Sequence, residues 1–207
     1  LLKTNTSGEL DRLSYIDSVS SFSASSSDAL YSILHDKEIR SAWLHIGSAQ
    51  AKMKAAILHS VAQVIDPPKD SSRGNQKMAT ISNASVMELI NAFGDENSCP
   101  TSELLLMLVQ KPIMEPRLAA FDLMRAICTR GVGARLMLSQ TGVFEYLVNR
   151  ETESSKEGRE SKYNVVVAIM NSEAKNLLAE NIVKDFTDIV KKGPHYIETK
   201  TWDMMTE

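Results

Sequence analysis

Hydrophobic residues recur every three or four positions along most of the chain, which is the spacing of one face of an α-helix. The clearest stripes predict a long helix from the N-cap residue Ser48 to about Ile65 and another that begins at Pro116. Weaker stripes predict shorter helices over about 28–46, 86–93, 104–109, 134–139, 143–149, 163–171 and 179–191. The apolar run 104–109 is also short enough to be a buried strand. Gly94 and Gly131 are expected to end their helices.

The two long helices resemble each other when one is shifted by 63 residues. The shift places Ala55, Leu58, Val61 and Ile65 on Leu118, Phe121, Met124 and Cys128. The interval can hold one or more repeats of about 40 residues, and such units bury their apolar faces only by stacking. We therefore predict an all-α fold of the armadillo/HEAT-like helical solenoid class, in preference to a closed bundle.

The chain divides into three parts. Residues 1–27 are rich in serine and are predicted to be a flexible segment or the remnant of a preceding repeat. Residues 28–192 carry the helical repeats, and residues 193–207 follow Lys191-Lys192-Gly193-Pro194 as a C-terminal tail. Within the repeats, the charged segment 151–162 is predicted to be a solvated face on which Lys156 pairs with Glu153 and Glu160. Because the first residue is Leu, we expect a piece of a longer protein.

Composition supports helices and excludes several classes of function. The 207 residues include 9 Gly and 6 Pro, and aromatic residues make up 6%, so turns and β-favouring side chains are scarce. The net charge of −3 provides no basic field for nucleic acid. The longest apolar runs have six residues, far fewer than a membrane span of about twenty. Two cysteines suit a reducing compartment, and we expect a soluble intracellular protein in the cytoplasm, with the nucleus as a second compartment.

The sequence contains no recognisable catalytic or metal-binding motif. The four histidines lack the spacing of a zinc hydrolase, and Gly131-Val132-Gly133 follows a helix, so it is interpreted as a corner between helices. We expect no enzyme activity, no metal and no cofactor. An enzyme assembled from the scattered residues His59, Cys128 and Asp122 is the alternative. Recognition is expected to use the polar face of the helix after Pro116, where Arg117, Asp122 and Arg125 form the candidate partner-binding row.

Four informative segments follow one another along the chain: Pro116–Ile127, Gly142–Arg150, Ser161–Val166 and Gly193–Ile197. In this order they resemble segments of the family of proteasome non-ATPase regulatory subunit 5. The resemblance covers about 112–198 and extends more weakly to 48–65. It departs at 131–133, where the family often carries a Trp.

The resemblance implies a non-catalytic armadillo/HEAT chaperone for assembly of the 19S regulatory particle of the 26S proteasome. Its implied partner is the C-terminal domain of a base AAA ATPase subunit. The alternative with the same fold is a scaffold or adaptor for another protein. Import-type armadillo adaptors carry Trp and Asn residues one turn apart on their inner helices. This chain has no such series of residues.

Overall fold

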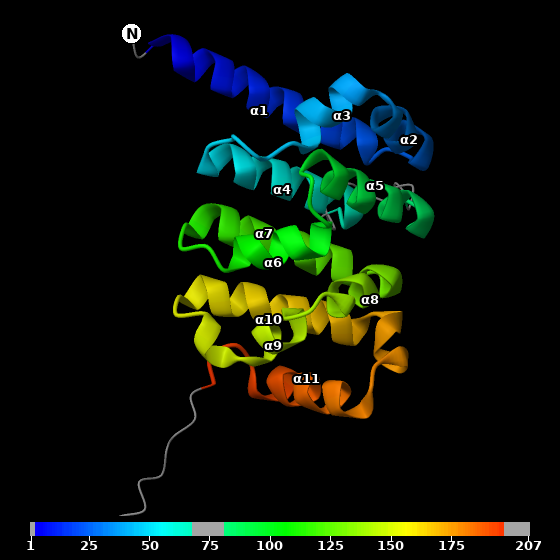
Figure 1. The fold of residues 1–207 in the computed structure, drawn as a ribbon, viewed down its shortest axis with the longest axis vertical. Helices are drawn as coiled ribbons and strands as arrows, with labels where there is room; N and C mark the ends of the chain where they lie inside the picture. The colour runs from blue at the N-terminus through cyan, green and yellow to red at the C-terminus, as the bar shows by residue number, and fades with distance from the viewer. Residues whose placement is uncertain (1–2, 68–80, 197–207) are drawn as a thin grey trace, which may run out of the picture.

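The computed structural model describes residues 3–67 and 81–196, and this part of the chain is entirely helical (Figure 1). The elements in chain order are α1 (Lys3–Ser23), α2 (Ser27–His35), α3 (Lys37–Leu44), α4 (Ala51–Ile65), α5 (Asn83–Glu96), α6 (Thr101–Val109), α7 (Met114–Cys128), α8 (Gly131–Ser139), α9 (Val143–Val148), η1 (Arg150–Thr152), α10 (Lys156–Asn171), η2 (Glu173–Leu177) and α11 (Glu180–Lys192). The all-α prediction is confirmed. The strand alternative for 104–109 is wrong, because these residues lie in α6. None of the described helices is long and apolar enough to cross a membrane.

The helices form a solenoid in which chain order follows the long axis of the molecule (Figure 1). The long helices α1, α4, α7 and α10 contact one another in succession, and α11 contacts α10 at the end of the stack. Two further α-helices separate each of these helices from the next: α2 and α3, then α5 and α6, then α8 and α9. Each apolar face is therefore covered by the neighbouring unit, as the stacking argument requires.

The predicted 63-residue shift is the true offset between α4 and α7. Both helices have 15 residues, and they begin at Ala51 and Met114. They form the most extensive helix–helix interface of the described chain, and His59 of α4 meets Asp122 of α7, 63 residues later. The side chains of Leu58 and Phe121 are fully buried in the continuous core.

The N-terminal segment corrects the prediction of flexibility. Residues 3–23 form α1, which packs on α4. Ile16 and Val19 enter the core, and the buried Ser20 donates a hydrogen bond from Oγ to the Ser60 carbonyl at 3.2 Å. Serine is small enough to lie at a close contact between helices, so its abundance here does not prevent packing. The other interpretation, the remnant of a preceding repeat, stays a prediction.

Two glycines that were predicted to end helices lie within helices in the structure. Gly94 lies inside α5 and is buried, and Gly131 begins α8, although both were predicted to end helices. The corner between helices that was predicted at 131–133 lies at 129–130, between the end of α7 and the start of α8, and residues 131–133 form the first turn of α8. A Cβ atom at Gly133 would collide with the carbonyl of Ile127, so only glycine allows α8 to fold back against the end of α7.

The C-terminal helix closes the described stack. α11 buries Phe186 against Phe144, with ring centroids 5.5 Å apart, and exposes Lys184, Asp185 and Asp188. Of the predicted tail, 193–196 are described and 197–207 lie outside the described residues. The loop predicted after Pro68, at 69–76, and the start of the second block near Met78 also lie outside them.

Replacement of Phe121 by Ala is expected to lower the free energy of unfolding by about 3–5 kcal/mol, because the ring is fully buried between stacked helices. Chemical denaturation would measure the change. Phe22→Ala is the matched control, since Phe22 on α1 is 54% exposed. Similar losses for the two variants would contradict the packing described for α7.

Candidate functional site

A polar groove runs across the long helices α4, α7 and α10. Its volume is about 850 Å³, and its lining includes Gln63, Asp66, Asp122, Arg125, Asn164 and Asn171. These side chains come from successive units of the stack, so the groove crosses unit boundaries. A surface of this kind suits contact with an extended partner surface.

Arg125 holds together the charged side chains of the groove. Its Nη1 donates to Oδ2 of Asp66 at 2.5 Å, and its Nε and Nη2 donate to Oδ1 of Asp122 at 3.1 and 3.0 Å. Nδ1 of His59 lies 3.1 Å from Oδ2 of Asp122. The cluster therefore ties α4 to α7 at the surface above their apolar interface.

The electrostatics favour the charged forms of Asp122 and Arg125. Burial raises the pKa of the Asp122 carboxyl, but hydrogen bonds from His59 and Arg125 and their charges outweigh burial, so the pKa is lowered. Burial lowers the pKa of Arg125, but the two carboxylates outweigh it and raise the pKa. Two carboxylates and one guanidinium leave one negative charge when His59 is neutral. The groove thus presents fixed charges of both signs.

Arg117 lies apart from this cluster, so the predicted three-residue row is divided. The Arg117 side chain is 14% exposed, and its Nη2 lies 3.8 Å from Oε2 of Glu153. Asp122 and Arg125 share the groove, but Arg117 does not line it. On an α-helix, the offset of five positions from Arg117 to Asp122 corresponds to about 1.4 turns, so the two side chains lie roughly 140° apart around the helix axis.

Glu153 corrects the prediction of a solvated face over 151–162. Its carboxylate is buried, and Oε1 lies 2.7 Å from the Tyr146 hydroxyl. Gly158 makes room for it, because a side chain there would collide with the carboxylate. The pair of Lys156 with Glu160, 3.9 Å apart, is confirmed, whereas Glu153 pairs with Arg117 instead of Lys156. Helix α10 begins at Lys156, inside the charged segment.

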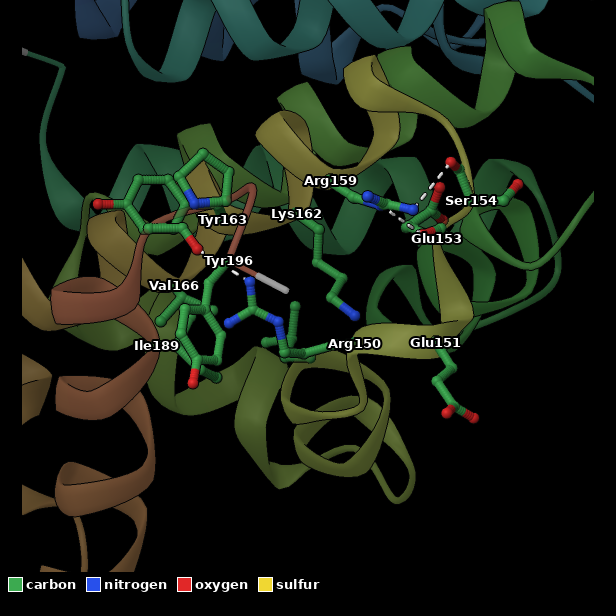
Figure 2. Close-up of a pocket in the computed structure, with 13 residues that line it drawn as sticks. Arg150, Glu151, Glu153, Ser154, Arg159, Lys162, Tyr163, Val166, Ile189 and Tyr196 are labelled. Atoms are coloured by element: carbon green, nitrogen blue, oxygen red, sulfur yellow. Dashed lines mark hydrogen bonds between the residues drawn. The ribbon is translucent and has the colours of Figure 1, made fainter. Parts of the chain in front are cut away.

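Lys162 is a buried cation that the sequence analysis missed. Its Nζ donates to the carbonyls of Tyr146 and Asn149 and to Oγ1 of Thr152. Figure 2 shows this side chain reaching across the pocket from α10. Burial lowers the pKa of Lys162 to about 8, with Arg150 adding repulsion against the attraction of Glu153. A signal existed: Lys162 precedes Val165, Val166 and Ile169 by three, four and seven residues, which puts it on their apolar stripe.

The three residues of the enzyme alternative are in different environments. His59 contacts Asp122, which lines the groove, but Cys128 is fully buried in the core. Burial raises the pKa of its thiol to about 12, so the nucleophilic thiolate is scarce near neutral pH. Among residues 3–67 and 81–196, no group of three or more His, Cys, Asp or Glu side chains could hold a metal ion.

Comparison with known proteins identifies relatives of the chain. A family model described as "Proteasome non-ATPase 26S subunit" matches residues 21–203. The human protein "26S proteasome non-ATPase regulatory subunit 5" is 27% identical over 97 residues, which are 46% of this chain and 19% of the relative. The match therefore spans about a fifth of that relative's length. No solved structure matches the chain.

The buried ammonium of Lys162 makes a testable contribution to the pH dependence of stability. Its pKa in the folded state lies below the ordinary value, so the cost of burying the charge is present below pH 8 and is relieved as the pH rises toward 10. Stability of the wild type relative to Lys162→Met should increase over this range by roughly 1–2 kcal/mol, after allowance for solvent screening.

Denaturation at a series of pH values would measure that difference. Lys192→Met, which removes an exposed lysine on α11, is the control and should show a constant difference from the wild type. The raised pKa of Cys128, which weakens stability in alkali, contributes equally in all three proteins. A constant difference for Lys162→Met as well would refute the buried-cation interpretation.

The two cysteines should react differently with a thiol reagent such as dithionitrobenzoate. Cys99 is partly exposed, whereas Cys128 is buried. In the folded protein we expect only Cys99 to react, and in denaturant both. Cys99→Ala should abolish the reaction of the folded protein, and rapid native labelling of Cys128 in that variant would restore it as a candidate nucleophile.

Proposed function

Because the chain belongs to the Proteasome non-ATPase 26S subunit family, we propose that it is a non-catalytic chaperone for assembly of the 19S regulatory particle of the 26S proteasome. Its partner in this proposal is the C-terminal domain of a base AAA ATPase subunit. The human relative is itself described as a regulatory subunit of the 26S proteasome.

The polar groove across α4, α7 and α10 is the observation that carries the proposal. It combines a continuous surface over three units with the fixed charges of Asp66, Asp122 and Arg125. A small folded domain needs a broad contact surface, which a stack of helices supplies and a narrow pocket does not. Asp122 and Arg125 are the contact residues of this proposal, and Arg117, which faces Glu153, is not one of them.

The charged character of the groove suits a partner that must later be released. Half-exposed charges add specificity and speed association, but contribute little net affinity because they exchange water and existing ion pairs for new contacts. Asp66 and Asp122 already bind Arg125 in the free protein. A partner anion therefore competes with these carboxylates for Arg125, which keeps the complex moderate in strength.

Three further features belong to the same proposal. We assign the units to the armadillo type, because two further α-helices precede each of the helices α4, α7 and α10. We place the protein in the cytoplasm, with the nucleus as a second compartment. An adaptor for another protein is the second candidate, and the groove is compatible with both because its chemistry does not specify one partner.

Binding to isolated C-terminal domains of the base ATPases tests the proposal, with the assembled proteasome as comparison. We expect one domain to bind selectively and the mature particle not to bind. Arg125→Ala should weaken the complex by about tenfold, since it removes the group that orients both carboxylates. Calorimetry of this chain and of the longer parent protein would measure the affinity.

Lys184→Ala is the matched control, because Lys184 is exposed on α11 and does not line the groove. It should leave the affinity unchanged. Equal weakening by both variants would show that the groove is not the contact surface. Failure of the parent protein to bind any of the domains would refute the chaperone proposal and favour the adaptor.

A further inference from the structure

A second pocket lies where α9, α10 and α11 meet the start of the C-terminal tail (Figure 2). Its volume is about 460 Å³, within the range of roughly 300–1,000 Å³ of small-ligand sites. Its apolar wall consists of side chains from four segments, Leu147, Tyr163, Val166, Ile189 and Pro194, and Tyr196 stands at its edge. It shares no lining residue with the groove.

Three cations and two carboxylates also line this pocket. The cations are Arg150, Arg159 and Lys162, and the carboxylates are Glu151 and Glu153. Figure 2 shows Glu151 pointing away from Arg150 and Lys162. Glu153 accepts a hydrogen bond from Tyr146 at Oε1, and its Oε2, which has no hydrogen-bond partner among the described residues, lies 3.8 Å from Nη2 of Arg117. With three cations against two carboxylates, the lining carries a net positive charge.

Arg150 has hydrogen-bonding capacity left over. Its Nη2 donates to the Gly193 carbonyl at 3.0 Å, and its guanidinium carbon lies 5.2 Å from the centre of the Tyr196 ring. Its Nη1 is buried, and among the described residues it has no hydrogen-bond partner. A buried guanidinium N–H without an acceptor is costly, so this position favours an acceptor from a bound molecule.

The other cations do not compete for such an acceptor. Nζ of Lys162 already donates to three oxygens, and Arg159 donates to the carbonyls of Glu153 and Ser154. They contribute positive charge, whereas Arg150 contributes a buried nitrogen that has no hydrogen-bond partner among the described residues. An anion beside Arg150 would also relieve its repulsion with Lys162, which is one cause of the lowered pKa of that lysine.

We propose that this pocket binds a carboxylate of a partner peptide, with Arg150 as its hydrogen-bonding anchor and the apolar wall covering the adjoining side chain. A guanidinium recognises a carboxylate with directed, charge-assisted hydrogen bonds. The apolar wall favours a peptide over a small inorganic anion, which would leave that surface uncovered. The carboxylate comes from the peptide C-terminus or from a Glu side chain.

Calorimetry with three acetylated pentapeptides separates these sources. The first is Gly-Ser-Ala-Leu-Leu with a free C-terminal carboxylate, the second is its C-terminal amide, and the third is the amide Gly-Ser-Glu-Leu-Leu. We expect the first or the third to bind and to identify the source, and the second not to bind. Binding of the amide control as tightly as the acids, or no binding of either acid, would overturn the proposal.

The matched pair of variants is Arg150→Met and Lys192→Met. Each removes one cation beside the Tyr196 ring, but Lys192, 5.0 Å from the ring centre, does not line the pocket. Arg150→Met should weaken binding by about tenfold or more, and Lys192→Met by less than about twofold. Equal losses would indicate a diffuse charge effect and would refute the site.

Two further measurements keep the test decisive. Circular dichroism checks the fold, and if Arg150→Met does not fold, Arg150→Lys retains the charge but loses the planar fork and should still weaken binding.

The tail beyond Tyr196 contains Glu198, Asp203 and Glu207. If acidic peptides bind only after these residues are changed to Gln or Asn, the pocket belongs to the chain's own tail and the partner proposal is wrong. The test is independent of the proposed function, because the pocket and the groove use different residues.

Discussion

The interface between α4 and α7 is the contact on which the rest of the structure depends. Each helix carries an apolar stripe that is too wide to be covered within its own unit, and Leu58 and Phe121 are fully buried only because the two helices stack. The same alignment brings His59 to Asp122 and Asp66 to Arg125 at the surface. The same alignment of α4 and α7 therefore buries the apolar stripes and brings the charged side chains of the groove together. A substitution that disrupts the buried interface would also separate these charged side chains.

Polar contacts complement this packing in the last units. Glu153, Tyr146 and Lys162 join the turn after α9 to α10, and Arg117 joins the same turn to α7. Buried charges contribute little net stability, because desolvation offsets their attraction. Their partners, however, occupy fixed positions in three elements, so they favour one arrangement of these elements over others. That arrangement places Arg150 and the segment 193–196 around the second pocket.

The groove and the pocket differ in the state of their charged groups. In the groove, Arg125 is already bound by two carboxylates, so a partner must exchange existing contacts. In the pocket, one N–H of Arg150 has no acceptor among the described residues, so a ligand adds a contact. Exchange of existing ion pairs for contacts with a partner favours specific, reversible association over a broad surface. Addition of a hydrogen bond to a donor that had none favours tight recognition of one chemical group. The two surfaces are thus suited to partners of different size.

The sequence by itself determined the helical class, the 63-residue offset between α4 and α7 and most helix positions, because the periods of hydrophobic residues and turn residues are local properties of the chain. It also indicated Asp122 and Arg125 as neighbours, since three residues separate them on one helix. Only the tertiary structure decided that α1 is packed, that Glu153 is buried beside Arg117, and that Arg150 lines a pocket with 193–196. The physical reason is that burial of these groups depends on how distant helices stack and on their rotation about their own axes. Neither quantity is encoded in the local spacing of residues.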